Sequence, residues 1–166
     1  MDQVAAEAGV SKPTIYLRYD SKEDLATAAL AHLRLEHAPR DGRDLRSVLV
    51  EHLRHLRRTC DELSWMSMLG TVLMEENHTP DLLRLWRERV SVPYRRLLEE
   101  ILAAAAERGE IPPPDDPGTT VDMLLGGYYA RYLSGELFPE DWPEPLVDAV
   151  LASLGYRGAH DYPSPG

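Results

Sequence analysis

Apolar residues recur at the spacing of amphipathic helices along almost the whole chain, and this pattern restricts the possible folds more than any other feature. Between Leu45 and Cys60, for example, an apolar side chain returns about every three or four positions. No run of alternating β-branched residues and no Asn-Gly or Asp-Gly turn between apolar segments suggests a strand or a hairpin. The sequence therefore predicts an all-α fold.

Capping residues predict where the helices begin and end. Gly9 follows a short helical segment at the N-terminus, and glycine is the usual residue just past a helix end. Ser11 is suited to cap the next helix, which has Pro13 in its first turn, and Ser21 is suited to cap a third. Further helices are predicted over residues 45–60, 63–75, 80–108, 119–135 and 143–154. Pro93 lies inside one of them and predicts a kink there.

Composition indicates a protein with its own apolar core and no membrane span. The chain has 166 residues, of which 43% are hydrophobic. No apolar stretch is long enough to cross a bilayer, and no signal peptide is visible. The single cysteine, Cys60, cannot form an internal disulfide and lies on an apolar helical face, so we expect it in the core of a cytoplasmic protein.

The net charge of −10 disfavours attraction of the whole molecule to DNA, but the charge is unevenly distributed. The only two lysines, Lys12 and Lys22, lie close to Arg18, and Asp20 is the one acidic residue between positions 9 and 22. That segment therefore carries a local charge of +2, from three basic residues and one acidic residue. A small basic region of this kind is compatible with DNA binding.

Two short helices joined by a tight glycine turn are the basic unit of a DNA-reading helix-turn-helix. On the second helix, Ile15 and Tyr19 share one face and are expected to pack inward. Thr14, Leu17 and Arg18 point away from that face, toward the base edges of a bound DNA. Spacing alone leaves an ordinary helical hairpin as an equal alternative.

The segment from Val4 to Leu25 resembles the signature of TetR-type (tetracycline-repressor) regulators. It contains Ala-Gly-Val-Ser, then two variable residues, a hydroxyl residue, an aliphatic residue and Tyr; an aromatic residue, Ser-Lys-Glu and Leu follow farther on. The resemblance implies a helix-turn-helix DNA-binding domain over residues 1–38, a helical effector-binding and dimerisation domain over 44–155, and a loose tail over 156–166. It also implies a ligand-responsive repressor that binds palindromic operator DNA as a homodimer.

The resemblance assigns eight side chains of this sequence to the DNA contact. They are Ser11, Lys12, Pro13, Thr14, Tyr16, Leu17, Arg18 and Lys22. Tyr16 matches the family's phosphate-contacting tyrosine, with core packing as the alternative. Lys22 lies at a helix N-terminus, where the backbone attracts a phosphate, with a solvated surface charge as the alternative.

Members of this family begin with a further helix and a basic arm ahead of the segment that starts here at Met1. The resemblance therefore implies that the first helix of the DNA-binding domain is missing from this sequence. We expect this chain to bind operator DNA poorly and a version extended upstream to bind it well. The alternative function is a helical ligand-binding or protein-interaction module that no longer binds DNA.

Residues 119–135 are apolar nearly all round, so this helix must be buried on two sides. Together with the helix over 143–154, it resembles the family's four-helix dimer interface, and an ordinary monomeric core is the alternative. The predicted interface residues are Leu124, Leu125, Tyr132, Leu146, Val147, Val150, Leu151 and Leu154. Gly126 and Gly127, in the middle of the first helix, suggest a close helix approach.

Large apolar residues of the middle helices are candidates for a small-molecule pocket, because aromatic and Met side chains can line permissive cavities. They are Trp65, Met68, Leu69, Leu73, Trp86, Tyr94, Met123 and Tyr128. Ordinary core packing is the alternative for each of them. The resemblance implies a small apolar or aromatic effector, which would favour a conformation with low affinity for DNA.

Patterns for catalysis and metal binding are weak. His52 and His55 are three positions apart, which is half of a metal site, so we expect a partly exposed surface pair instead. We predict no metal and no cofactor, and no catalytic motif supports the third hypothesis, a small helical enzyme. Arg54, Arg57 and Arg58 form a strip expected to be solvated, with contact to DNA or to an anionic ligand as the alternative.

Overall fold

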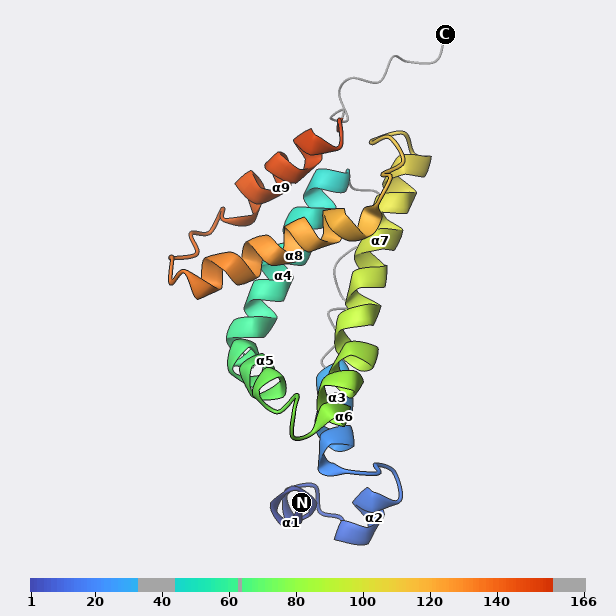
Figure 1. Cartoon of the computed structure of the whole chain (residues 1–166), viewed down its shortest axis with the longest axis vertical. Helices are drawn as coiled ribbons and strands as arrows, with labels where there is room; N and C mark the ends of the chain where they lie inside the picture. Colours follow the sequence, from blue (N-terminus) through green and yellow to red (C-terminus); the bar gives the residue numbers. More distant parts are fainter. Residues whose placement is uncertain (33–43, 63, 157–166) are drawn as a thin grey trace. The chain divides into compact units, whose positions relative to one another are not determined.

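The computed structural model describes residues 1–32, 44–62 and 64–156, and every regular element in these ranges is a helix, as predicted (Figure 1). In chain order the elements are α1 (Asp2–Glu7), α2 (Lys12–Tyr16), α3 (Lys22–His32), α4 (Leu45–Glu62), α5 (Trp65–Met74), α6 (Pro80–Trp86), the π-helical segment η1 (Arg87–Ser91), α7 (Val92–Glu107), α8 (Pro117–Leu133) and α9 (Pro143–Ser153). Within these ranges, no helix combines the length and the apolar character needed to cross a membrane. The connector before residue 44 and the tail after residue 156 lie outside the described residues.

The chain divides into two compact units, each built from two stretches of sequence. Unit 1 comprises Met1–Arg34 and Met66–Pro93, and unit 2 comprises Leu35–Trp65 and Tyr94–Gly166. Unit 1 joins the N-terminal helices to α6 and η1, because α3 packs along both of them. The linear boundary predicted at residues 38–44 does not separate these units, since α6 and η1 follow it in the sequence.

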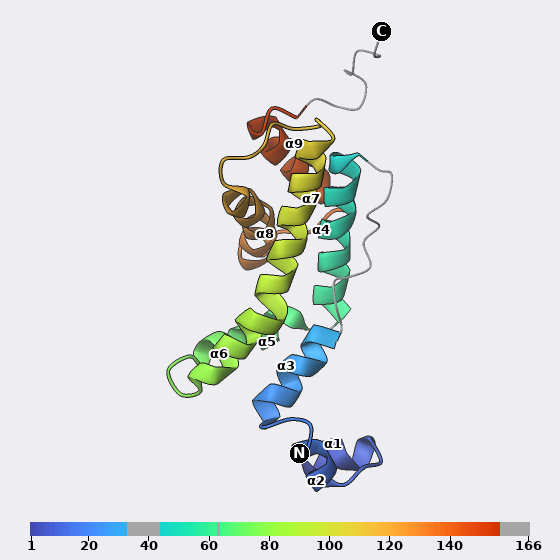
Figure 2. The same ribbon diagram turned by 90° about the vertical axis from the view of Figure 1, so that its right-hand side faces the viewer.

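In unit 1, α1 and α2 form a helix-turn-helix (Figure 2). Gly9 follows α1 with a φ of +64°, a left-handed conformation that glycine adopts without strain. The Ser11 hydroxyl caps α2, because it accepts a hydrogen bond from the Thr14 N–H at 3.3 Å. Ala5 of α1 and Ile15 of α2 are buried, so this pair of helices is held by a local turn, a cap and a few apolar contacts.

The long helix predicted over residues 80–108 is irregular next to Pro93. In η1, the backbone N–H of Val92 donates to the carbonyl of Arg87, five residues earlier. Pro93 has no N–H to donate to the Arg89 carbonyl, and its ring would clash with that carbonyl in a regular α-helix. The wider π turn accommodates the proline, so the helix departs from regular α geometry directly before Pro93, where a kink was predicted.

Unit 2 is organised around α4, on which α8 and α9 both pack (Figure 1). The buried residues of α4 are Leu45, Val48, Leu49, Val50, His52, Leu53, Leu56 and Cys60. Val121, Leu124 and Tyr128 of α8 face inward together with Val147 and Leu151 of α9. The apolar periodicity of these helices is therefore explained by contacts within the chain.

Candidate DNA-binding surface and effector site

All eight residues that the sequence assigns to DNA are exposed in unit 1: Ser11, Lys12, Pro13, Thr14, Tyr16, Leu17, Arg18 and Lys22. Leu17 is the most exposed large apolar side chain among them, at 89%. Ile15, on the opposite face of α2, is buried, and Tyr19 is half-buried. The helix therefore presents Thr14, Leu17 and Arg18 to solvent, and an apolar side chain in this position can contact a thymine methyl group.

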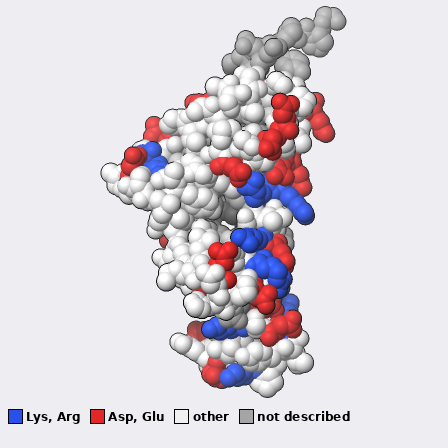
Figure 3. Space-filling model, viewed as in Figure 1, with Lys and Arg blue, Asp and Glu red and all other residues white. Residues whose placement is uncertain are grey.

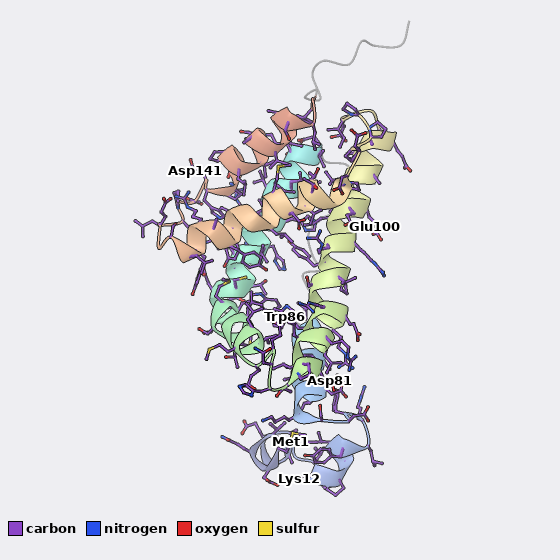
Figure 4. All side chains as sticks on the ribbon, in the orientation of Figure 1. Met1, Lys12, Asp81, Trp86, Glu100 and Asp141 are labelled. Atoms are coloured by element: carbon purple, nitrogen blue, oxygen red, sulfur yellow. The ribbon has the colours of Figure 1, made fainter. Side chains whose placement is uncertain are left out.

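The charge of this surface is lower than the sequence suggested. Lys12 of α2, which is labelled in Figure 4, forms an ion pair with Asp2 of α1, with Nζ to Oδ1 at 3.0 Å. The hydrogen bond between the two groups lowers the pKa of Asp2 and raises the pKa of Lys12. Asp2 lies outside the stretch 9–22 whose charge was counted, and only the packing of α1 on α2 brings its carboxylate to Lys12.

The turn between α2 and α3 is held by side chains of the third helix. The Asp24 N–H donates to the Ser21 hydroxyl at 3.0 Å, which caps α3 as predicted. The Asp24 carboxylate accepts a hydrogen bond from the Asp20 N–H at 2.9 Å. Asp24 also forms an ion pair with Arg89 of η1, which the sequence did not indicate because the two residues are 65 positions apart.

The predicted pocket residues do not gather in one unit. Met68, Leu69, Leu73 and Trp86 belong to unit 1, whereas Trp65, Tyr94, Met123 and Tyr128 belong to unit 2. Leu73 and Met123 are exposed, so in this chain their side chains do not line an enclosed site. Trp65, Tyr94 and Tyr128 are buried in unit 2 and remain candidates for contact with a ligand.

A group of polar aromatic side chains surrounds Cys60 inside unit 2. The Tyr128 hydroxyl hydrogen-bonds with the Cys60 thiol, and burial raises the pKa of Cys60 to about 11. Burial also raises the pKa of Tyr94, and its hydroxyl has no hydrogen-bond partner among the described residues. The group is therefore uncharged at neutral pH and contains one buried hydroxyl, that of Tyr94, without a hydrogen-bond partner among the described residues.

The arginine strip of α4 is engaged within unit 2. Arg54 pairs with Glu144, and Arg58 lies 3.4 Å from Glu51. Arg57 donates to the Phe138 carbonyl at 2.8 Å and lies over the Phe138 ring. These contacts account for the strip without DNA or an anionic ligand.

A cavity of about 220 Å³ lies between α4 and α7, and none of the predicted pocket residues lines it. It is lined by Val48, Leu97, Glu100, Ile101, Ala104 and Arg108. Its volume is below the roughly 300 Å³ at which pockets for drug-sized ligands begin, so it does not identify an effector site.

Four of the predicted dimer residues are buried within the chain: Leu124, Val147, Val150 and Leu151. A side chain that its own chain already covers offers no surface to a second subunit, so these four belong to the core of unit 2. Leu125, Leu146 and Leu154 are half-buried, and Tyr132 is exposed. Half of the predicted set is therefore covered within the chain, and the other four residues keep surface that a second subunit could contact.

The opposite face of α8 and α9 is exposed and carries small and apolar residues. They are Met123, Gly126, Ala130 and Leu133 of α8 and Pro145, Ala149 and Ala152 of α9. Figure 3 shows few charged side chains over α8 on the face drawn. The two glycines lie on different faces of α8. A Cβ on Gly127 would lie 2.5 Å from Leu146 Cδ2, so Gly127 faces α9, whereas a Cβ on Gly126 would meet nothing within 4 Å.

We expected His52 and His55 to form a partly exposed pair on the surface, but only His55 is partly exposed. His52 is buried, with its ring centroid 6.4 Å from that of Tyr94, and His55 is half-buried. Within the part of the chain that the structure describes, no group of three or more His, Cys, Asp or Glu residues is arranged to hold a metal ion.

Two family models match the chain and between them cover most of it. The model described as bacterial regulatory proteins of the tetR family matches residues 1–29. The model described as the tetracyclin repressor-like C-terminal domain matches residues 39–150.

Individual proteins are similar over nearly the same span. HTH-type transcriptional regulators of Mycobacterium bovis and Mycobacterium tuberculosis are 31% identical over 154 residues, which is 91% of this chain and 75% of each relative. The solved structure of the TetR family transcription regulator SCO0332 has a TM-score of 0.77 and 30% identity, over 91% of this chain and 84% of that one. The flavonoid-responsive regulator FrrA has a TM-score of 0.64 at 24% identity, over 93% and 83%, a likeness of fold alone.

Proposed function

Since the chain belongs to the TetR family of transcription regulators, we propose that it is a repressor that binds palindromic operator DNA as a homodimer and is released by a small apolar or aromatic molecule. One observation carries the DNA-binding part of this proposal. α2 exposes Thr14, Leu17 and Arg18 on one face, while Ile15 on the other face is buried. This is the arrangement that a recognition helix needs in the major groove.

Two further side chains are suited to hold the DNA backbone. Tyr16 is exposed at the end of α2, and its hydroxyl can donate to a phosphate oxygen. Lys22 is exposed at the first position of α3, where the helix N-terminus adds its own positive potential. Such contacts fix the position of the recognition helix without reading sequence.

The exposed face of α8 and α9 supports a homodimer. Its small residues allow the helices of two subunits to approach closely, and its apolar residues lose contact with water when they do so. A two-fold dimer would present two copies of α2 to the two halves of a palindrome. The interface that we propose is centred on Gly126 and Ala149, not on the buried residues selected from the sequence.

The polar aromatic group around Cys60 supports an effector site in unit 2. A ligand that accepts a hydrogen bond from the Tyr94 hydroxyl would satisfy a group that has no partner among the described residues. The aromatic rings of Trp65 and Tyr128 would supply apolar contacts. Such a ligand releases DNA if it binds better to a conformation in which the two copies of α2 are wrongly spaced.

Selection from a pool of random-sequence duplex DNA tests the proposed function. A version of the chain extended upstream of Met1, which we expect to bind DNA better than the chain itself, is expected to enrich one palindromic sequence and to bind it in a gel-shift titration. A variant with Thr14→Ala, Leu17→Ala and Arg18→Ala is expected to lose at least about a hundredfold in affinity, since each base contact contributes about 1–3 kcal/mol.

A matched variant removes the same residue types from elsewhere on the surface. Thr71, Leu73 and Arg96 are exposed and lie outside α1, α2 and α3, so their replacement by Ala is expected to leave DNA affinity within about twofold. Enrichment of no sequence, or equal affinity of the two triple variants, would contradict the proposal. The first result would favour a helical module that binds a ligand or a protein but not DNA.

A further inference from the structure

Arg89 makes the longest-range polar contact to the N-terminal helices that we observe in unit 1. Its Nη2 atom lies 2.5 Å from Asp24 Oδ1. Its Nη1 atom donates to the Asp24 carbonyl at 2.9 Å and lies 3.4 Å from the Thr27 hydroxyl. One guanidinium therefore reaches both a side chain and the backbone of α3.

Asp24 extends this contact to the end of α2. It is 9% exposed, and while Oδ1 faces Arg89, Oδ2 accepts the hydrogen bond from the Asp20 N–H. Asp20 lies in the short turn that follows the recognition helix. The single carboxylate thus joins three segments of unit 1: the turn after α2, the first turn of α3, and η1.

A buried carboxylate with two partners is sensitive to the loss of either one. When one partner is removed, the charge stays in a poorly hydrated environment without compensation. The carboxylate must then move toward water, and this movement disturbs the hydrogen bond to the Asp20 N–H. Removal of the Arg89 guanidinium is therefore expected to alter the turn after α2, which contains Asp20.

The position of Arg89 on its helix depends on Pro93. In a regular α-helix each residue advances the side-chain direction by about 100°, so one extra residue in a turn redirects the side chains around it. η1 contains such a wider turn, and its last hydrogen bond spans from Val92 to Arg87. Pro93 disfavours the regular alternative, because it lacks the N–H that would donate to the Arg89 carbonyl.

We infer that Arg89 is a positioning residue for DNA binding, which with Asp24 fixes the direction in which unit 1 presents α2 and which is itself aimed by the π turn next to Pro93. This inference rests on the proposed function and adds a residue that does not touch DNA to the DNA-binding machinery. A change in η1 that withdraws Arg89 lowers operator affinity without altering any side chain on the DNA surface.

A pair of variants in the same turn tests the inference. Arg89→Met removes the guanidinium and keeps an unbranched side chain of similar length. Arg87→Met makes the same change two residues earlier, where the side chain is 62% exposed and lies 3.9 Å from Glu76. Both variants lose one positive charge, so a nonspecific effect on the attraction to DNA is the same in both.

Operator affinity is measured on the palindromic duplex that the extended wild-type chain enriches from a random pool. Arg89→Met is expected to weaken binding by at least about tenfold, because it unpairs a buried carboxylate. Arg87→Met is expected to weaken it by less than about threefold, as for an exposed pair. Arg89→Lys retains the charge but lacks the planar guanidinium that donates to three acceptors. Its loss of operator affinity is expected to lie between those of Arg89→Met and Arg87→Met.

Backbone hydrogen exchange separates positioning from general stability and needs no DNA. Faster exchange at residues 18–25 in Arg89→Met, with exchange in α8 and α9 unchanged, supports positioning. Pro93→Ala is expected to share the affinity loss of Arg89→Met, because the regular helix becomes available. Equal exchange and equal affinity for Arg89→Met and Arg87→Met would overturn the inference. An extended wild-type chain that enriches no sequence contradicts the proposed function first and this inference with it.

Discussion

On the surface that we assign to DNA, the positive charge of Lys12 is paired with the Asp2 carboxylate of the same chain. Asp2 and Lys12 are both exposed, so their ion pair is weak in water and opens at little cost. When Lys12 turns to a phosphate, however, the Asp2 carboxylate remains close to the DNA and repels it. Asp2 is therefore expected to limit affinity.

The change Asp2→Asn is expected to tighten operator binding about threefold at low salt, because it removes one charge several ångströms from the phosphates. The gain is expected to shrink as the salt concentration rises. Glu7→Gln is the matched control, since Glu7 is an exposed acidic residue of the same helix that does not pair with Lys12. Gel-shift titrations of both variants measure the effect, and an equal gain in both would show that only net charge matters.

Tyr94 and Tyr128 are buried tyrosines that differ in the pairing of their hydroxyls. Tyr94→Phe removes a hydroxyl without a partner among the described residues, so it is expected to raise the free energy of unfolding by about 1 kcal/mol. Tyr128→Phe removes the hydroxyl that hydrogen-bonds with Cys60. This change is expected to lower the free energy of unfolding by about 1 kcal/mol. Urea unfolding of the two variants measures both changes, and the same sign for both would contradict this description of the site.

An effector screen extends this comparison to ligand binding. A compound that releases the wild-type chain from its operator is expected to bind Tyr94→Phe about tenfold more weakly, because a hydrogen bond is lost. Unchanged affinity would place the effector elsewhere.

Residues governed by local sequence were predicted well, and those governed by distant contacts were not. Ser11, Gly9 and the exposed face of α2 follow from capping and helical periodicity, which act within a few residues. The role of Asp24 does not follow from local sequence. Its ion pair with Arg89 depends on how α3 packs on η1, and no pattern in the sequence records that packing.

At the scale of elements, α8 illustrates what an apolar pattern leaves open. The sequence shows that this helix is apolar on two sides, but it does not show which side the chain itself covers. In the structure Val121, Leu124 and Tyr128 are covered, and the side with Met123 and Gly126 is exposed. The choice between the two faces requires the position of α9, which fits against Gly127 through Leu146.

Substitution of Gly126 tests the exposed face as a dimer interface. Gly126→Arg is expected to weaken dimerisation by at least about tenfold, because a buried charge without a partner is costly. The fold of each subunit should persist, since the space beside Gly126 is open. Sedimentation velocity measures the dimer, and circular dichroism measures the fold.

Two controls accompany that substitution. Gly126→Ala adds only a methyl group and favours the helix, so dimerisation is expected to remain. Ala103→Arg adds the same charge at an exposed position of α7 and should also leave the dimer intact. A dimer that survives Gly126→Arg would exclude the interface proposed here.

At the scale of the whole molecule, the two units are built from interleaved parts of the chain. The sequence suggested a linear succession of a DNA-binding domain and an effector domain. In the structure, unit 1 takes α6 and η1 from the middle of the sequence and packs them with α3. A linear reading cannot show this arrangement, because it arises from contacts between residues far apart in the chain.

The net charge of −10 has a consequence for DNA binding by the homodimer that we propose. Long-range attraction to DNA is weak for such a protein, so affinity depends on close contacts at the two copies of α2. In the homodimer that we propose, these contacts require both copies to fit their half-sites at once, so affinity should depend on the spacing of the half-sites.

Affinity as a function of half-site spacing tests this account most directly. The duplex enriched by the extended wild-type chain is altered by inserting base pairs between its two halves, and binding is measured at one salt concentration. The account predicts a sharp optimum and a loss of at least about a hundredfold when roughly five base pairs, half a helical turn, are inserted. Binding that is independent of spacing, or binding by a single subunit with the same affinity, would contradict it.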